Sequence, residues 1–153
     1  MIRSATPADA PAVYRLSLEL HARSRYSHIP PCEQKVKRLI AMIIGAPTQF
    51  CWVSERNGEI EGVLLAAVDE ILWSRKKEAH DLWFYVRDSA RGDGARLARK
   101  FIAWAKSRNV ALIGLSVSSG IGETGRTQEF LEALGLRRHG GIYAMFCGGG
   151  NAL

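Results

Sequence analysis

The feature that most constrains the fold is an apolar run that meets two glycines and then an amphipathic pattern, between Trp83 and Leu97. The run over residues 83–86 predicts a β-strand, and the helical spacing that follows predicts a helix. Such a junction leaves backbone N–H groups unpaired at the positive end of the helix dipole, where phosphate oxygens bind well. We expect Gly92 and Gly94 to adopt left-handed dihedral angles and to admit a ligand close to the backbone. The sequence therefore predicts a site for a phosphate-bearing cofactor.

The length and charge of the chain narrow the choice of ligand without fixing it. With 153 residues, the chain is long enough for one domain with a buried core. We expect that domain over residues 1–147 and a flexible tail over residues 148–153, which begins with three glycines. The net charge of +6 suits a nucleotide-like cofactor, and it also suits nucleic acid. Because the basic residues are dispersed along the sequence, nucleic acid is the less favoured partner.

The three cysteines and the start of the chain bear on its location. Cys32, Cys51 and Cys147 lie far apart and lack metal-ligand spacing. An odd and sparse set of cysteines favours reduced thiols in a cytoplasm over a disulfide framework. No apolar signal core opens the sequence, and no apolar run approaches membrane-spanning length. We therefore expect a cytoplasmic protein with no bound metal and no membrane partner.

Hydrophobic periodicity predicts the order strand, helix, helix, three strands, helix, strand, helix, strand. The helix at the N-terminal end is expected to be capped by Thr6, with Pro7 at its first position. Asn57 and Gly58 predict a tight hairpin turn. This order favours an α/β fold with a mixed sheet and helices on both faces. The strands are expected over residues 2–5, 50–55, 60–68, 80–86, 110–117 and 141–147, the helices over 7–22, 33–44, 96–108 and 128–134, and linkers over 69–79 and 118–124.

In element order and length, essentially the whole chain resembles the GCN5-related N-acetyltransferase (GNAT) superfamily. The sharper match is the stretch from Tyr85 to Gly94, which resembles the family's fourth strand and its pyrophosphate loop, Gln/Arg-x-x-Gly-x-Gly/Ala. With Arg91 as the first motif position, Gly94 fits the fourth but Arg96 occupies the sixth. With Ser89 first, both glycines fit but serine replaces Gln or Arg. Either register places the same loop on the pyrophosphate.

This resemblance implies a GNAT-like fold, with a central mixed and mostly antiparallel sheet, and acetyl-CoA as the acyl donor. It implies that backbone groups near Tyr85 and Val86 hold the pantetheine arm and polarise the thioester carbonyl. Arg91 or Arg96 would add a charge-assisted contact to the phosphates. The backbone amides implied to hold the pyrophosphate are those of Gly92, Asp93, Gly94, Ala95 and Arg96.

The residues of the chemical step are less well marked. Relatives commonly use a tyrosine as general acid in a Leu-Tyr-x-x-Leu-Gly-Phe pattern, but Leu131 stands at that position here. By analogy with relatives, His80 and Asp81, at the start of the strand before the glycines, are the candidate general bases. Each could instead be an ordinary polar residue at a strand end.

These observations favour an N-acetyltransferase in which a primary amine, small-molecule or peptide, attacks the thioester directly. Direct attack is expected because no nucleophile motif surrounds the cysteines, two of which lie in apolar runs that favour inert thiols. One alternative is a non-catalytic module that binds coenzyme A. Another is a basic protein that binds or acylates nucleic acid. A homodimer is compatible with the resemblance, since relatives often pair through sheet edges.

Overall fold

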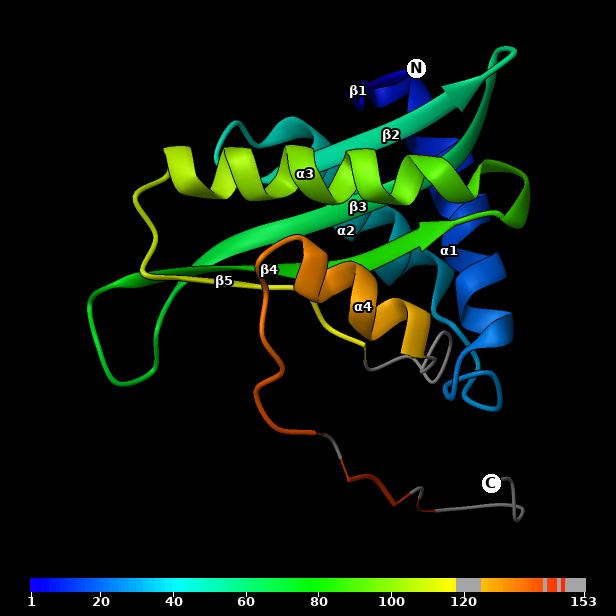
Figure 1. Ribbon diagram of the computed structural model, residues 1–153. Coiled ribbons are helices and arrows are strands. Elements are labelled where there is room, and N and C mark those ends of the chain that lie inside the picture. Colours follow the sequence, from blue (N-terminus) through cyan, green and yellow to red (C-terminus); the bar gives the residue numbers. More distant parts are fainter. Residues whose placement is uncertain (118–124, 142, 146, 148–153) are drawn as a thin grey trace.

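The computed structural model describes residues 1–117, 125–141, 143–145 and 147, which form one sheet with helices on both faces (Figure 1). Neighbouring strands are antiparallel except β4 and β5, which are parallel. The predicted mixed, mostly antiparallel sheet is therefore confirmed. Among the described residues, no helix combines the length and apolar character needed to cross a membrane. The strands lie in the order β1 (Ile2–Ser4), β2 (Phe50–Arg56), β3 (Glu59–Glu70), β4 (Lys77–Val86) and β5 (Leu112–Gly114).

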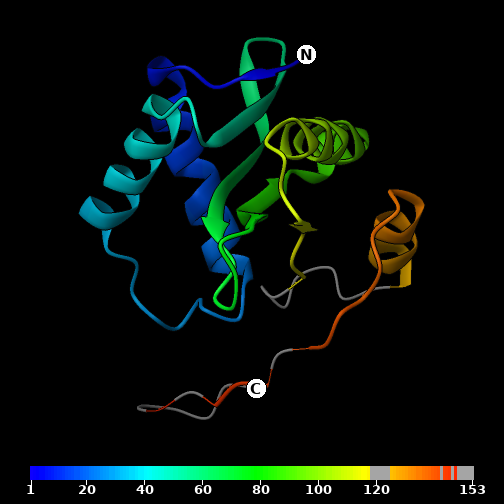
Figure 2. The same ribbon diagram turned by 90° about the vertical axis from the view of Figure 1, so that its left-hand side faces the viewer.

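Helices α1 (Ala10–Arg23) and α2 (Glu33–Gly45) cover one face of the sheet, and α3 (Arg91–Ser107) covers the other (Figure 2). Strand β3 is apolar on both faces because Val63 and Leu65 pack toward α1 and α2 while Leu64 packs toward α3. Cys51 on β2 is buried on the α1 side, and burial raises the pKa of its thiol to about 12. The two cores fix the position of α3 over the centre of the sheet.

Local signals placed the N-terminal elements well. A short 3₁₀ helix, η1 (Pro7–Asp9), precedes α1, and Pro7 stands at its first position as predicted. The Asp9 carboxylate accepts hydrogen bonds from the backbone N–H of Thr6 at 2.7 Å and from two nitrogens of Arg3 at 2.7 and 2.8 Å. These bonds tie β1 to the start of the first helical layer.

The β2–β3 turn is also confirmed, whereas the β3–β4 connection is shorter than predicted. Asn57 and Gly58 have φ angles of 50° and 79°, the left-handed pair that suits a two-residue hairpin. Glu70 pairs with Lys77, so the expected linker over residues 69–79 reduces to residues 71–76. A register shift lets Leu65 pair with Trp83 and Ala66 with Asp81, which leaves a bulge at Leu82.

The prediction for the two glycines was wrong in conformation. Helix α3 begins at Arg91, directly after the 3₁₀ helix η2 (Asp88–Ala90), and therefore contains Gly92 and Gly94. Among the glycines that the structure describes, those with left-handed φ angles are Gly58, Gly135 and Gly140. The helix can include two poor helix formers because Asp93 between them is anchored to β2, as described below.

The C-terminal third departs further from the sequence-based expectation. Strand β5 keeps only three residues of the predicted strand over 110–117. Helix α4 (Gly125–Ala133) is followed by Gly135 with a φ angle of 86°. Residues 141, 143–145 and 147 form no strand, with Tyr143 and Met145 exposed, because an apolar run needs a partner strand to become one. Residues 142 and 146, the linker over 118–124 and the tail over 148–153 lie outside the described residues.

Candidate functional site

The site is centred on the point where β4 and β5 diverge. The two strands pair only at Glu78–Leu112, Ala79–Ile113 and His80–Gly114. One residue beyond the last pair, the Asp81 carboxylate accepts hydrogen bonds from the Ser116 N–H at 2.7 Å and the Ser116 hydroxyl at 3.2 Å. From Leu82 onward, the edge of β4 that faces β5 has no strand partner within the described part of the chain. We call this point the fork.

The bulge at Leu82 lies immediately beyond the fork. A bulge interrupts the regular ladder and turns backbone groups away from the neighbouring strand. Leu82 is 39% exposed although it lies within β4. Free backbone groups are thus available on β4 where the two strands separate.

The same free edge runs directly into the start of α3. The N-cap residue Ala90 makes no side-chain capping bond, so no side chain of that residue covers the N–H groups of the first turn. A Cβ built on Gly92 would meet no atom within 4 Å, which leaves open space beside these groups. A Cβ on Gly94 would lie 3.7 and 3.8 Å from Phe84 and Val86, so this position packs against β4. The geometry suits a phosphate-bearing ligand that follows β4 and ends at α3.

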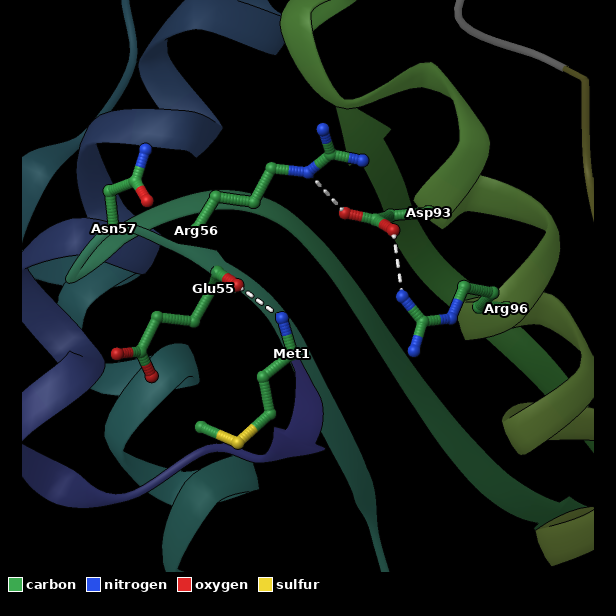
Figure 3. Close-up of a pocket in the computed structure, with 6 residues that line it drawn as sticks. All are labelled: Met1, Glu55, Arg56, Asn57, Asp93 and Arg96. Atoms are coloured by element: carbon green, nitrogen blue, oxygen red, sulfur yellow. Dashed lines mark hydrogen bonds and ion pairs between the residues drawn. The ribbon is translucent and has the colours of Figure 1, made fainter.

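Asp93 reaches the site only with its backbone. Its side chain is 3% exposed and accepts hydrogen bonds from the Ser54 hydroxyl at 2.5 Å and from Arg56 Nε at 2.8 Å. Arg96 Nη1 lies 3.2 Å from its other oxygen (Figure 3). The Arg56 guanidinium, followed by the Ser54 hydroxyl, holds the pKa of Asp93 well below its usual range. The Asp93 carboxylate therefore anchors α3 to β2.

The cations around the start of α3 are paired with carboxylates. Arg91 lies 3.0 Å from Asp88, and Arg96 shares Asp93 with Arg56. Arg87, which follows β4 directly, forms ion pairs with Glu19 and Glu61, with nitrogen–oxygen distances of 2.6 Å and 3.3 Å. Of the positive groups here, the helix amides are the ones left without a counter-charge.

A cavity of about 570 Å³ lies beside α3, and Figure 3 shows the residues that line it. It lies at the β2–β3 hairpin, and the sheet order puts β2 and β3 on the opposite side of β4 from β5. Both cationic and acidic side chains line this cavity, and Asp93 and Arg96 form the wall contributed by α3. The lining residues are Met1, Glu55, Arg56, Asn57, Asp93 and Arg96.

On the α1 face, the side chain of Tyr85 is held by α1. Arg23 Nη1 donates a hydrogen bond to the Tyr85 hydroxyl at 3.1 Å, and its guanidinium lies 5.8 Å from the ring centroid. Arg87, with a further hydrogen bond from Tyr85, lowers the pKa of Glu19. The Arg87 N–H donates to the Glu61 carbonyl on β3, so by strand alternation the backbone groups of Tyr85 also face β3, while those of Val86 lie on the free edge of β4, where the family resemblance implies a pantetheine contact.

The structure does not bring His80 and Asp81 together. His80 pairs with Ala67 and Asp81 with Ala66, so consecutive side chains point to opposite faces, with Asp81 on the α3 side. Burial raises the pKa of Asp81, and the bonds from Ser116 oppose that shift. His80 Nδ1 is buried and has no hydrogen-bond partner among the described residues, while Nε2 lies 3.7 Å from Asp69.

Several contacts of the site were missed from the sequence. Ser54 and Arg56 hold Asp93, Ser116 holds Asp81, and Arg23 holds Tyr85. Each contact joins residues far apart in the chain, and no local pattern marks them. Among the described residues, no group of three or more histidine, cysteine, aspartate or glutamate side chains could hold a metal ion.

The chain matches no family model and no curated protein by sequence. Its structure is similar to a putative acetyltransferase from Agrobacterium tumefaciens str. C58, with a TM-score of 0.71, 18% identity, and coverage of 96% of this chain and 99% of that chain. It is also similar to a transcriptional regulator from Bacillus halodurans C-125, with a TM-score of 0.70, 25% identity, and coverage of 95% of this chain and 99% of that chain. For glucosamine-6-phosphate N-acetyltransferase from Arabidopsis thaliana, the TM-score is 0.72 and the identity 15%, with coverage of 95% of this chain and 97% of that chain. These likenesses and the fork between β4 and β5 show that the chain has the fold of the GCN5-related N-acetyltransferase superfamily.

Proposed function

We propose that the protein is an N-acetyltransferase that transfers the acetyl group of acetyl-CoA to a primary amine. The observation that carries this proposal is the continuous path from the fork along the free edge of β4 to the open amides of α3. The names of similar structures, which include aminoglycoside and glucosamine-6-phosphate N-acetyltransferases, support the reaction class. The acceptor amine is left open.

The donor site is proposed to use backbone groups more than side chains. Acetyl-CoA supplies the acetyl group as a reactive thioester. The outward-facing backbone groups of Val86, next to Tyr85, hydrogen-bond to the pantetheine arm as an added strand would, and the amides of residues 92–96 hold the pyrophosphate. The open space at Gly92 fits this role. Arg91 and Arg96 contribute less because each already has a carboxylate partner.

The chemical step is proposed to take place at the bulge. Backbone N–H groups around Leu82 polarise the thioester carbonyl, because groups fixed by the fold need little reorganisation in the transition state. His80 is the proposed base that accepts the proton of the amine through water, because its side chain is 38% exposed and its buried Nδ1 has no hydrogen-bond partner among the described residues. Asp81 is the weaker candidate because Ser116 occupies both of its oxygens. Its proposed role is to keep the fork open.

The donor site is tested by isothermal titration of acetyl-CoA into the wild type and Gly92→Glu, with ATP as the control ligand. The new carboxylate fits the open space and the helix start, so the variant should fold, but its charge repels the phosphates. We expect acetyl-CoA binding to be lost in Gly92→Glu and retained in Gly125→Glu, a matched change at the start of α4, where a Cβ also meets nothing within 4 Å. Unchanged affinity in a folded Gly92→Glu would refute the site.

Turnover is tested by thiol release across a panel of primary amines. The proposal requires coenzyme A release with at least one amine and a strong loss of that release in His80→Gln. Acetyl-CoA binding without release across the panel would support a non-catalytic module instead. Normal turnover in His80→Gln would remove His80 from the chemical step and leave the donor site standing.

A further inference from the structure

A second basic site lies at the opposite end of α3. The β3–β4 loop and the connection from α3 to β5 meet there, at the left of Figure 1. Between them is a pocket of about 470 Å³, which we call the basic pocket. Four of its lining side chains are cationic and none is a carboxylate. The lining residues are Arg75, Lys76, Lys77, Arg108, Asn109, Val110 and Ala111.

The lining residues of the basic pocket carry an excess of positive charge, with Glu70 opposite Lys77 in the β3–β4 ladder just outside the lining. The side chains of Arg75, Lys76 and Lys77 form no ion pair with any residue that the structure describes. Arg108 is positioned by neutral groups, the Pro47 carbonyl at 2.9 Å and the Trp104 ring at 5.4 Å. Cations gathered in excess of nearby carboxylates repel one another, and a bound polyanion relieves that repulsion.

An ordered loop presents two large apolar side chains beside these charges. The Ile71 N–H donates to the Lys76 carbonyl at 2.9 Å, and the Ser74 N–H donates to the Ile71 carbonyl at 2.8 Å. At the tip, Leu72 is 85% exposed and Trp73 is 89% exposed. An indole held in solvent by a closed loop, two residues before a run of cations, is suited to stacking on a flat ligand group.

We propose that the basic pocket and Trp73 bind single-stranded nucleic acid. The phosphates contact Arg75, Lys76 and Lys77, and a base stacks on Trp73. A nucleic acid fits better than a lipid surface because the cations line a hollow that a flat bilayer does not enter. This inference is independent of the proposed acetyl transfer, since the site lies at the other end of α3.

The first measurement is fluorescence anisotropy of a labelled oligothymidylate of about 12 nucleotides with the full chain at several salt concentrations. Three phosphate contacts predict a slope of about −2 for the logarithm of affinity against the logarithm of salt. Unlabelled oligonucleotide should quench the tryptophan fluorescence of the wild type more than that of Trp73→Phe. Affinity that does not depend on salt would overturn the proposal.

Matched variants locate the site. Arg75→Gln with Lys76→Gln removes two charges from the pocket and should weaken binding about tenfold while reducing the salt slope. Lys35→Gln with Arg38→Gln removes the same charge from the exposed surface of α2 and should leave binding unchanged. Trp73→Ala should weaken binding about fivefold or more, and Trp73→Phe should retain most of it.

Two results would overturn the assignment. Equal loss of affinity in the pocket and α2 pairs would show attraction to net charge alone. Binding to phosphatidylserine vesicles through Trp73, with no oligonucleotide binding, would make the loop a membrane contact instead. Circular dichroism of every variant verifies that folding is retained, as expected for exposed positions.

Discussion

The two ends of α3 treat positive charge in opposite ways. At the N-terminal end, Arg91 and Arg96 are matched by Asp88 and Asp93. At the C-terminal end, the cations of the basic pocket have no carboxylate among its lining residues. An anion at the first end meets neutral N–H groups and a dipole, whereas an anion at the second end meets full charges. The net charge of +6 is therefore displayed unevenly, and residue counts alone do not reveal where it acts.

The largest expected effect comes from making the first end resemble the second. Asp93→Asn leaves Arg56 and Arg96 without their carboxylate and weakens the link between α3 and β2. Because hydrogen bonds to charged groups contribute more than neutral ones, we expect this substitution to lower the free energy of unfolding by about 2–3 kcal/mol. Urea denaturation measures this loss. Ser54→Ala removes one bond to the same carboxylate and should cost less; equal losses would contradict the role given to the arginines.

The pH dependence of stability tests the carboxylate that anchors the N-terminal end of α3, together with Asp9. The pKa of Asp93 is lowered chiefly by Arg56, and that of Asp9 chiefly by Arg3. Because the folded-state pKa values lie below the unfolded ones, their stabilisation is present above the unfolded values and is lost as pH falls toward the folded values. Urea denaturation should show the unfolding free energy falling below about pH 5, with a shallower fall in Asp93→Asn. An unchanged pH dependence in that variant would rule out Asp93 as a source of acid sensitivity.

Salt should distinguish the ligands of the two ends. Between about 50 and 200 mM salt, oligonucleotide affinity is expected to fall about tenfold or more. Acetyl-CoA affinity should fall less, because the proposed contacts at α3 are backbone amides and the nearby arginines are already paired. Parallel titrations at each salt concentration measure both. A steeper salt dependence for acetyl-CoA would mean that free charges dominate its binding.

The smallest effect expected is on the helix dipole itself. Lys106 lies in the last turn of α3, where a cation is favourable, so Lys106→Gln should cost about 0.3–1 kcal/mol at low salt. Arg91→Gln, at the positive end, should cost less because its pair with Asp88 is exposed. Thermal unfolding of the two variants at low salt compares them directly, and a larger loss in Arg91→Gln would reverse this expectation.

Sequence reasoning succeeded where local chemistry decides the outcome. Asn57 and Gly58 specify their turn through dihedral preference, and apolar spacing located α1 and α2. It failed where a distant partner decides. The helical state of Gly92 and Gly94 accompanies the anchoring of Asp93 to Ser54, and at the fork Asp81 accepts a hydrogen bond from Ser116. The apolar run at the C-terminal end predicts a strand, but residues 141, 143–145 and 147 form none, because no sequence pattern records whether a partner strand is present.

Because Cys51 is buried on β2, the rate at which its thiol reacts reports how often this part of the core opens to solvent. Its thiol is buried and its raised pKa leaves almost no thiolate in the folded state, so alkylating reagents should reach it only after the sheet separates from α1. The exposed Cys32 and Cys147 should react at once. The rate of the slow third modification, at Cys51, then measures how often the core between the sheet and α1 opens, and no engineered probe is needed.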